Sequence, residues 1–174
     1  MVTRTPTAAD LAQHVCLALV VEGVDHGWAV GSVLAADGGL GRIWTLSRPL
    51  VYRAIDQLVD DGRVRRRGTA PGRGRNRTLL APTSAGRRDD RAWLDRPVVH
   101  LRDVRIDLLV KLELRRRRGL GSEGFLDRQF ASLDPLIVAM SGRDGDLVDR
   151  WRAEQARAVE RFLVVARAQA VEGG

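Results

Sequence analysis

The 174-residue chain has a single cysteine, Cys16, and a single lysine among its 29 basic residues. One cysteine cannot form an internal disulfide, so the cysteine content does not point to an oxidising compartment. No stretch approaches the roughly 18 consecutive apolar residues of a membrane-spanning helix, and the polar residues 1–7 do not have the form of a secretory signal. We therefore expect a cytoplasmic protein with no membrane partner.

Residues that hold metals or catalyse reactions are also sparse. The three histidines, His14, His26 and His100, are scattered and share no ligand spacing with Cys16. We instead expect His26 to cap or orient the helix that follows it. Residues 119–124 match the letters of a dinucleotide-binding glycine pattern, but they follow an arginine-rich helix end and not a strand. The sequence therefore predicts no metal site, no cofactor and no enzymatic activity.

The charge is concentrated in one part of the chain. The net charge is +7 overall, and residues 42–88 alone carry twelve arginines against three aspartates. Residues 89–174 are almost balanced, with sixteen basic and fifteen acidic residues. A basic block of this size is typical of a surface that binds a polyanion, and the balanced remainder is typical of solvated helices.

Residues 47–58 form the stretch that is most informative about function. Ser47 can cap a helix, and Pro49 falls in its first turn, where a missing N–H is harmless. One side of this helix is apolar, since hydrophobic residues recur at three- and four-residue steps, at Val51, Ala54, Ile55, Leu58 and Val59. The other side carries Arg48, Tyr52 and Arg53, which suit phosphates and guanine edges but also suit an ordinary solvated surface.

The elements around this helix are arranged in a recognisable order. We expect helices over 7–22 and 26–37, a brief strand or extended lead-in over 42–46, and strands over 63–67 and 77–81. Three helices followed by a basic hairpin is the order of a winged helix-turn-helix. Its third helix, with Ser47 at its start, enters the major groove, and the hairpin contacts the DNA backbone or minor groove through Arg73, Arg75 and Arg77.

A second, helical domain is expected after a boundary near residues 82–97. Helices are predicted over 99–118, over 122–140 with a kink or break at Pro135, and over 144–171. The last helix has two neighbouring apolar stripes, and three such helices alone give a thin core. We therefore expect one stripe to pack against a second copy of the chain; its members are Leu147, Trp151, Ala158, Phe162 and Val165.

Four tryptophans are candidates either for the core or for a ligand pocket. Trp44 and Trp93 are interpreted as core or interface residues. Trp28 and Trp151 are candidates for a pocket that takes a flat ligand, because an indole offers a large apolar surface.

Several motifs resemble those of the PadR transcriptional regulators. Glu22-Gly23 followed by His26-Gly27-Trp28 is similar to the family's E-G-x-x-H-G-Y segment, with Trp28 in place of tyrosine. Residues 41–62 are similar to its recognition-helix stretch, and residues 75–86 resemble the strand that ends in L-T-x-x-G, although an Ala-Pro pair precedes the threonine and the usual tyrosine is absent. The resemblance is best over residues 14–96.

The resemblance implies a homodimer held by C-terminal helices, usually a repressor, with some members releasing DNA when they bind a small, often aromatic or drug-like molecule. The expected fold is mainly α with a small β-hairpin wing, divided into a DNA-binding domain over 1–96 and a dimerisation or effector domain over 97–174. The partners are then a pseudo-palindromic double-stranded operator, a second copy and a small-molecule effector. The alternative is a winged-helix protein-interaction module that does not read DNA sequence.

Overall fold

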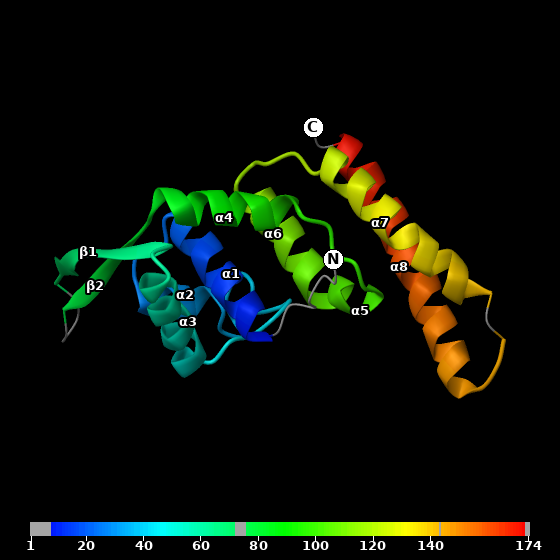
Figure 1. The fold of residues 1–174 in the computed structure, drawn as a ribbon, viewed down its shortest axis with the longest axis horizontal. Coiled ribbons are helices and arrows are strands. Elements are labelled where there is room, and N and C mark those ends of the chain that lie inside the picture. Colours follow the sequence, from blue (N-terminus) through cyan, green and yellow to red (C-terminus); the bar gives the residue numbers. More distant parts are fainter. Residues whose placement is uncertain (1–7, 72–75, 143, 173–174) are drawn as a thin grey trace. The chain divides into compact units, whose positions relative to one another are not determined.

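The computed structural model describes residues 8–71, 76–142 and 144–172 (Figure 1). The chain divides into two compact units, Met1–Leu94 and Asp95–Gly174. In the described residues no single helix is long and apolar enough to cross a membrane; the first two helices taken together meet the length and composition, but they are bent by 109° at their junction.

The first unit contains the predicted three helices and hairpin. Its elements are α1 (Ala8–Glu22), α2 (Gly27–Val33), α3 (Arg48–Asp60), β1 (Val64–Ala70), β2 (Arg77–Pro82) and α4 (Ser84–Asp95). The two strands are antiparallel, with Val64 opposite Pro82 and Ala70 opposite Arg77, and a bulge interrupts the register between Arg66 and Gly68. The hairpin therefore begins directly after the helix that carries Arg48, Tyr52 and Arg53.

The core of this unit is built on α1. Seven of its side chains are buried, Ala12 and every residue from Val15 to Val20, including Cys16. Helix α3 buries the predicted apolar face, with Val51, Ala54, Ile55 and Leu58 inside. At the other end of the unit, Trp93 of α4 is buried and stacks on His14 of α1 with 5.1 Å between ring centroids. Because the inner face of α3 is fixed in this way, its opposite face is exposed.

One local prediction for this unit was wrong, and one open alternative was decided. The helix expected over 26–37 ends at Val33, because the chain folds back through turns: Leu40 N–H donates to Val33 O, and Leu46 N–H donates to Leu34 O. A side chain at Gly41 would lie 1.7 Å from the carbonyl oxygen of Ala35, so only glycine fits this turn. Residues 42–46 are a turn and an extended lead-in, not a strand.

Of the two predicted helix caps, the one on α2 is confirmed and the one on α3 is not. Ser47 occupies the N-cap position of α3 with an extended backbone, but its hydroxyl makes no capping hydrogen bond. His26 does cap α2, as predicted: Ala29 N–H donates to Nδ1 of His26 over 2.9 Å.

The second unit is helical throughout its described length. It contains α5 (Leu101–Asp103), a π-helical turn η1 (Val104–Leu108), α6 (Leu109–Arg117), α7 (Glu123–Ser141) and α8 (Leu147–Glu172). The single helix predicted over 99–118 is therefore interrupted by the π turn. Pro135 lies inside α7 without ending it. Helices α7 and α8 lie side by side (Figure 1).

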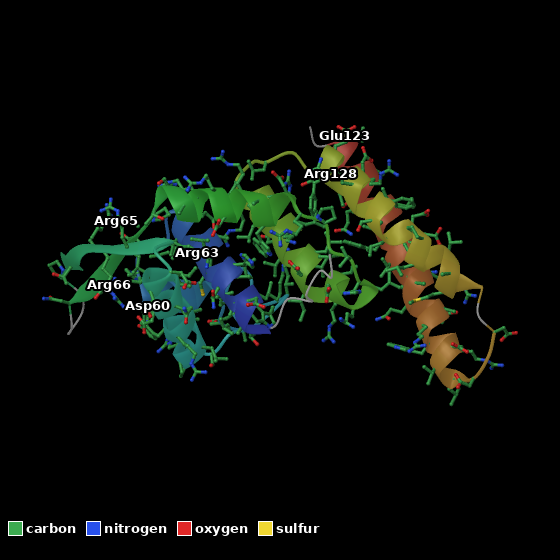
Figure 2. The ribbon with its side chains drawn as sticks, in the orientation of Figure 1. Asp60, Arg63, Arg65, Arg66, Glu123 and Arg128 are labelled. Atoms are coloured by element: carbon green, nitrogen blue, oxygen red, sulfur yellow. The ribbon has the colours of Figure 1, made fainter. Side chains whose placement is uncertain are left out.

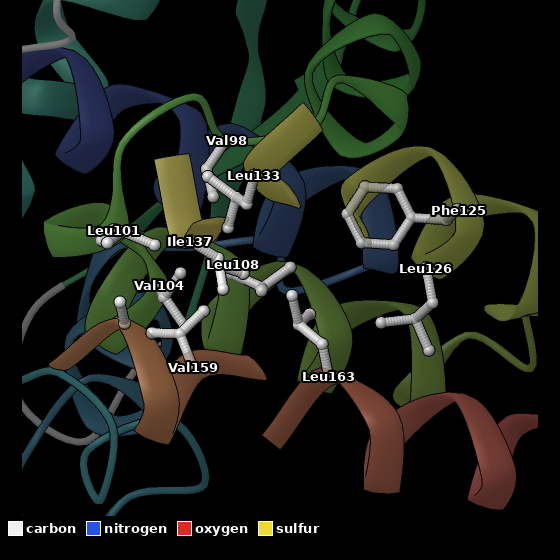
Figure 3. Close-up of a cluster of buried hydrophobic side chains, with 11 residues drawn as sticks. Val98, Leu101, Val104, Leu108, Phe125, Leu126, Leu133, Ile137, Val159 and Leu163 are labelled. Atoms are coloured by element: carbon white, nitrogen blue, oxygen red, sulfur yellow. The ribbon is translucent and has the colours of Figure 1, made fainter. Parts of the chain in front are cut away.

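The core of the second unit is a cluster of buried hydrophobic side chains (Figure 3). Its buried members are Val98, Leu101, Val104, Leu108, Phe125, Leu126, Leu133, Ile137, Ala156, Val159 and Leu163. The buried amide of Gln129 accepts from Val98 N–H over 2.8 Å and donates to Val98 O over 3.0 Å. This pair of hydrogen bonds fixes the segment before α5 to α7.

The π turn brings one buried ion pair into this unit. Lys111 Nζ lies 3.2 Å from Asp107 Oδ1, and their side chains are 2% and 12% exposed. The ammonium also donates to Arg96 O over 2.9 Å. Burial lowers the pKa of Lys111 and raises the pKa of Asp107, while the attraction between the two opposes both changes.

Candidate nucleic-acid interface

The exposed side of α3 carries the residues that the sequence assigned to it. Ser47, Arg48, Tyr52 and Arg53 are all exposed, whereas the opposite side of the helix is buried. Within the described residues, neither Arg48 nor Arg53 forms an ion pair with an acidic side chain. Their charges are therefore available to an external anion, and they lie in the first half of the helix, where free N–H groups also favour negative charge.

Trp28 connects this helix to the wing. Its indole is 51% exposed at the start of α2. The guanidinium carbons of Arg48 in α3 and of Arg77 in β2 each lie 5.9 Å from its ring centroid, within the range of a cation–π contact. Three elements therefore meet around one aromatic ring.

The approach of α2 to α3 at this point depends on Gly27. A Cβ added at Gly27 would lie 2.7 Å from Cε1 of Tyr52. Because glycine has no side chain, the ring of Tyr52 can pack against the backbone at the start of α2. This close approach holds Trp28 beside the exposed residues of α3.

His26 adds a second donor next to Arg77. Since Nδ1 of His26 accepts the capping hydrogen bond, the neutral ring carries its proton on Nε2. That Nε2 lies 3.2 Å from Nη1 of Arg77, so two N–H donors stand side by side. A phosphate oxygen is an acceptor that both donors could share.

A cavity of about 810 Å³ lies between these elements. It is lined by residues of α2, α3 and both strands of the hairpin, and Ile55 and Leu80 contribute buried apolar side chains. Its lining residues are His26, Gly27, Trp28, Tyr52, Ile55, Asp56, Arg66, Asn76, Arg77, Thr78 and Leu80.

The hairpin strand β1 presents three consecutive exposed arginines. Figure 2 shows Arg65 and Arg66 on opposite sides of β1, as expected of neighbours in a strand. Arg66 pairs with Asp56 of α3 over 2.6 Å, and Arg67 lies 3.6 Å from Asp25. Arg65 makes no ion pair within the part of the chain that the structure describes. Part of the basic block thus fixes the wing to the helices, and part remains uncompensated.

The predicted wing residues have different outcomes. Arg77 lies in β2 beside Trp28, whereas Arg73 and Arg75 lie outside the described residues. Sequence reasoning did not assign Trp28 to this surface, nor did it single out Arg65. The tryptophan at position 28, where the resembled motif has tyrosine, was the available signal for Trp28 at the start of α2.

The predicted stripe on α8 is mostly exposed. Leu147, Trp151 and Val165 are 83%, 68% and 55% exposed, and Ala158 is also exposed. Phe162 differs, because it is partly buried against the core of the second unit. Trp28 and Trp151 belong to different units. Among the described residues, no group of three or more His, Cys, Asp or Glu is placed to hold a metal ion.

No family model matches the chain, and no curated protein matches it in sequence. Solved structures do match. The crystal structure of Bacillus subtilis PadR in complex with operator DNA aligns over 95% of this chain and 99% of its own, with a TM-score of 0.50 and 17% identity. The chain has the PadR fold. PadR in complex with p-coumaric acid matches with a TM-score of 0.45 and 16% identity, over 92% of this chain and 98% of that one.

The PadR fold confirms the predicted fold class. The described residues are mainly helical, with one two-stranded antiparallel hairpin after the third helix and a helical second unit. In this fold α3 has the position of the third helix of a winged helix-turn-helix, and the β1–β2 hairpin has the position of its wing.

Proposed function

We propose that this chain is a DNA-binding transcriptional regulator of the PadR family. The observation that carries the proposal is the group of side chains around Trp28, where the exposed Arg48 of the recognition helix and the partly buried Arg77 of the wing approach the same ring. Both guanidinium groups can reach an external anion, and the surface joins the two elements that a winged helix uses on DNA.

The geometry of this surface supports separate roles for the residues of α3 and those of the wing. Arg48, Tyr52 and Arg53 lie on the exposed side of α3, where they contact base edges or flanking phosphates in the major groove. Arg77 and His26 bind one phosphate between the helices and the wing, with Arg65, Arg73 and Arg75 contributing further backbone contacts. Ser47, whose hydroxyl makes no capping bond, is free to donate to DNA.

We further propose that the protein acts in the cytoplasm as a homodimer on a pseudo-palindromic operator. The support is the apolar stripe of α8, since Leu147, Trp151 and Val165 are largely exposed although each is hydrophobic. Two-fold symmetry of a dimer suits an operator with two half-sites. Repression, and release of the operator by a small aromatic or drug-like ligand, complete the proposal by analogy with the family.

The test is binding of the purified full chain to DNA from immediately upstream of its own gene. Fluorescence anisotropy is measured at several salt concentrations, with a scrambled duplex of equal length as the control. We expect preference for the upstream duplex and a log–log salt slope near −0.9 for each phosphate neutralised. Binding to neither duplex at low salt would overturn the proposal and favour the alternative, a winged-helix module that binds proteins.

A further inference from the structure

Helix α4 carries a second basic surface, which the proposed operator contacts do not use. Arg87, Arg88 and Arg91 are exposed, and they lie away from the buried side of this helix. Within the residues that the structure describes, none of their guanidinium groups forms an ion pair. We call these three residues the α4 arginine cluster.

The acidic residues of α4 do not neutralise the cluster. Asp89 pairs with Arg63, the residue before β1. Asp90 is buried, at 3% exposure. Asp95, at the end of the helix, lies 2.9 Å from Arg115. The cluster therefore presents uncompensated positive charge to solvent.

The position of the cluster is electrostatically unfavourable for α4 itself. Arg87 and Arg91 are four residues apart, and like charges at this spacing destabilise a helix. Arg87 also lies in the first turn, which contains no acidic residue and where the helix dipole disfavours a cation. An external anion bound to the cluster relieves both repulsions.

The surroundings of the cluster favour a nucleic-acid backbone over an acidic protein. Protein interfaces are anchored by apolar and aromatic side chains, and none of the large hydrophobic side chains exposed in the described residues belongs to α4. A DNA duplex is bound without sequence preference through charge alone, and it carries one phosphate for about every 1.7 Å of its axis. Arg87 and Arg91 lie about 6 Å apart along the helix axis, so more than one phosphate is within their reach.

The cluster does not share a surface with the exposed side of α3. Figure 1 shows α3 and α4 on either side of α1. Gln13 of α1 lines a cavity together with Ala54 of α3, whereas the next residue, His14, stacks on Trp93 of α4. Because neighbouring helix residues point about 100° apart, α3 and α4 cover different sides of α1. A duplex held by α3 therefore does not cover the cluster.

We propose that the α4 arginine cluster binds the phosphate backbone of a second DNA duplex while α3 holds the operator. The protein then bridges its operator to another DNA segment. The bridging rests on the proposed function, but the contact between the cluster and DNA does not. Because the cluster does not read sequence, a variant that lacks it keeps the preference of α3 for the operator.

Anisotropy of a fluorescent scrambled duplex tests the second site on the full chain. The protein is first saturated with unlabelled operator at low salt. We expect the scrambled duplex to bind with a log–log salt slope of about −2.7 for each cluster, which is −0.9 for each of three phosphates. Arg87→Gln/Arg88→Gln/Arg91→Gln should weaken this binding at least about tenfold and leave operator affinity unchanged. Lysine at the same three positions should restore it, because phosphates are held by charge.

A matched variant controls for the loss of net charge. Arg105→Gln/Arg128→Gln/Arg152→Gln removes three exposed arginines of the second unit and should bind the second duplex like the wild type. Circular dichroism confirms that each variant folds. The inference is overturned if the operator-saturated wild type binds no second duplex, if the α4 glutamine variant binds it fully, or if the matched variant loses as much.

Two further arms separate this inference from its alternatives. Tighter binding of labelled poly-glutamate than of a duplex with equal charge would assign the cluster to an acidic protein and overturn the DNA contact. If the chain does not bind the operator, the proposed function fails. The scrambled duplex alone then decides the contact: weaker binding by the α4 glutamine variant supports it, and equal binding overturns it.

Discussion

Replacing Lys111 by methionine removes the cation from the buried ion pair at the π turn and keeps most of the side-chain volume. The carboxylate of Asp107 then stays at 12% exposure without a counter-charge, and the hydrogen bond from Nζ to Arg96 O is lost. Breaking a buried pair from one side costs about 3–5 kcal/mol. That is a large part of the roughly 5–15 kcal/mol that stabilises a typical domain.

A second substitution, at Asp107, measures how much of the lost stability comes from the unpaired carboxylate. In Lys111→Met/Asp107→Leu both charges are replaced by apolar groups, and such replacements are often neutral or stabilising. We therefore expect the double variant to be more stable than Lys111→Met alone. The free energy of unfolding is measured by urea denaturation followed by circular dichroism, with Arg102→Met, an exposed site in α5, as the control.

The loss of stability in Lys111→Met should depend on pH because of the carboxyl group of Asp107. Burial raises the pKa of this carboxyl group, and removal of Lys111 removes the attraction that opposes the rise. When the pKa of a carboxyl group is higher in the folded than in the unfolded protein, its protonation stabilises the fold. That stabilisation is fully present below the unfolded pKa of about 3.9 and is lost as the pH rises through the folded pKa. The difference between Lys111→Met and wild type should therefore be smaller near pH 4 than at pH 7. A loss below about 1 kcal/mol at pH 7 would refute the reasoning, because a solvated pair contributes no more than that.

Three further predictions follow from single residues. Burial raises the pKa of Cys16 from 9.0 to about 12, so iodoacetamide should label it only after unfolding, and stability should fall as the pH rises above 9 because only the unfolded thiol ionises. Gly86→Ala should lower the melting temperature sharply, because the added Cβ would lie 2.1 Å from the carbonyl oxygen of Arg63. The control Gly31→Ala should be tolerated, because its Cβ would lie 3.6 Å from the nearest side-chain atom. Equal melting temperatures for the two variants would contradict this prediction. Trp151→Glu should shift the sedimentation mass from dimer to monomer, and an unchanged dimer would exclude this residue from the interface.

Local sequence signals predicted the elements whose physical cause is local. The apolar steps from Val51 to Leu58 predicted the buried side of α3, and the basic turn between two short strands predicted the hairpin. His26 was correctly assigned as the cap of α2 because its place before the helix is itself the signal. These features depend on neighbours within a few residues.

The wrong or missing predictions depend on distant parts of the chain. Helix α2 ends at Val33 because Leu40 and Leu46 return to bond with it, and no local breaker marks that residue. The π turn contains Asp107, which pairs with Lys111, and the same ammonium donates to Arg96 O, 15 residues earlier in the chain. The contacts of Trp28 with Arg48 and Arg77 were missed because they join positions 20 and 49 residues away, while its place in a ligand pocket stays a prediction.

The account depends on sequence reading by the exposed side of α3, and one measurement tests that directly. Anisotropy gives the ratio of dissociation constants for a scrambled duplex and the upstream operator, for wild type and for Arg48→Ala/Tyr52→Phe/Arg53→Ala. A control variant, Arg87→Ala/Arg88→Ala, removes two exposed arginines of α4. We predict that the α3 variant loses most of the discrimination, at about 1–3 kcal/mol for each base contact, while the control keeps it. Equal discrimination by wild type and the α3 variant would contradict the assignment of α3 as the recognition helix.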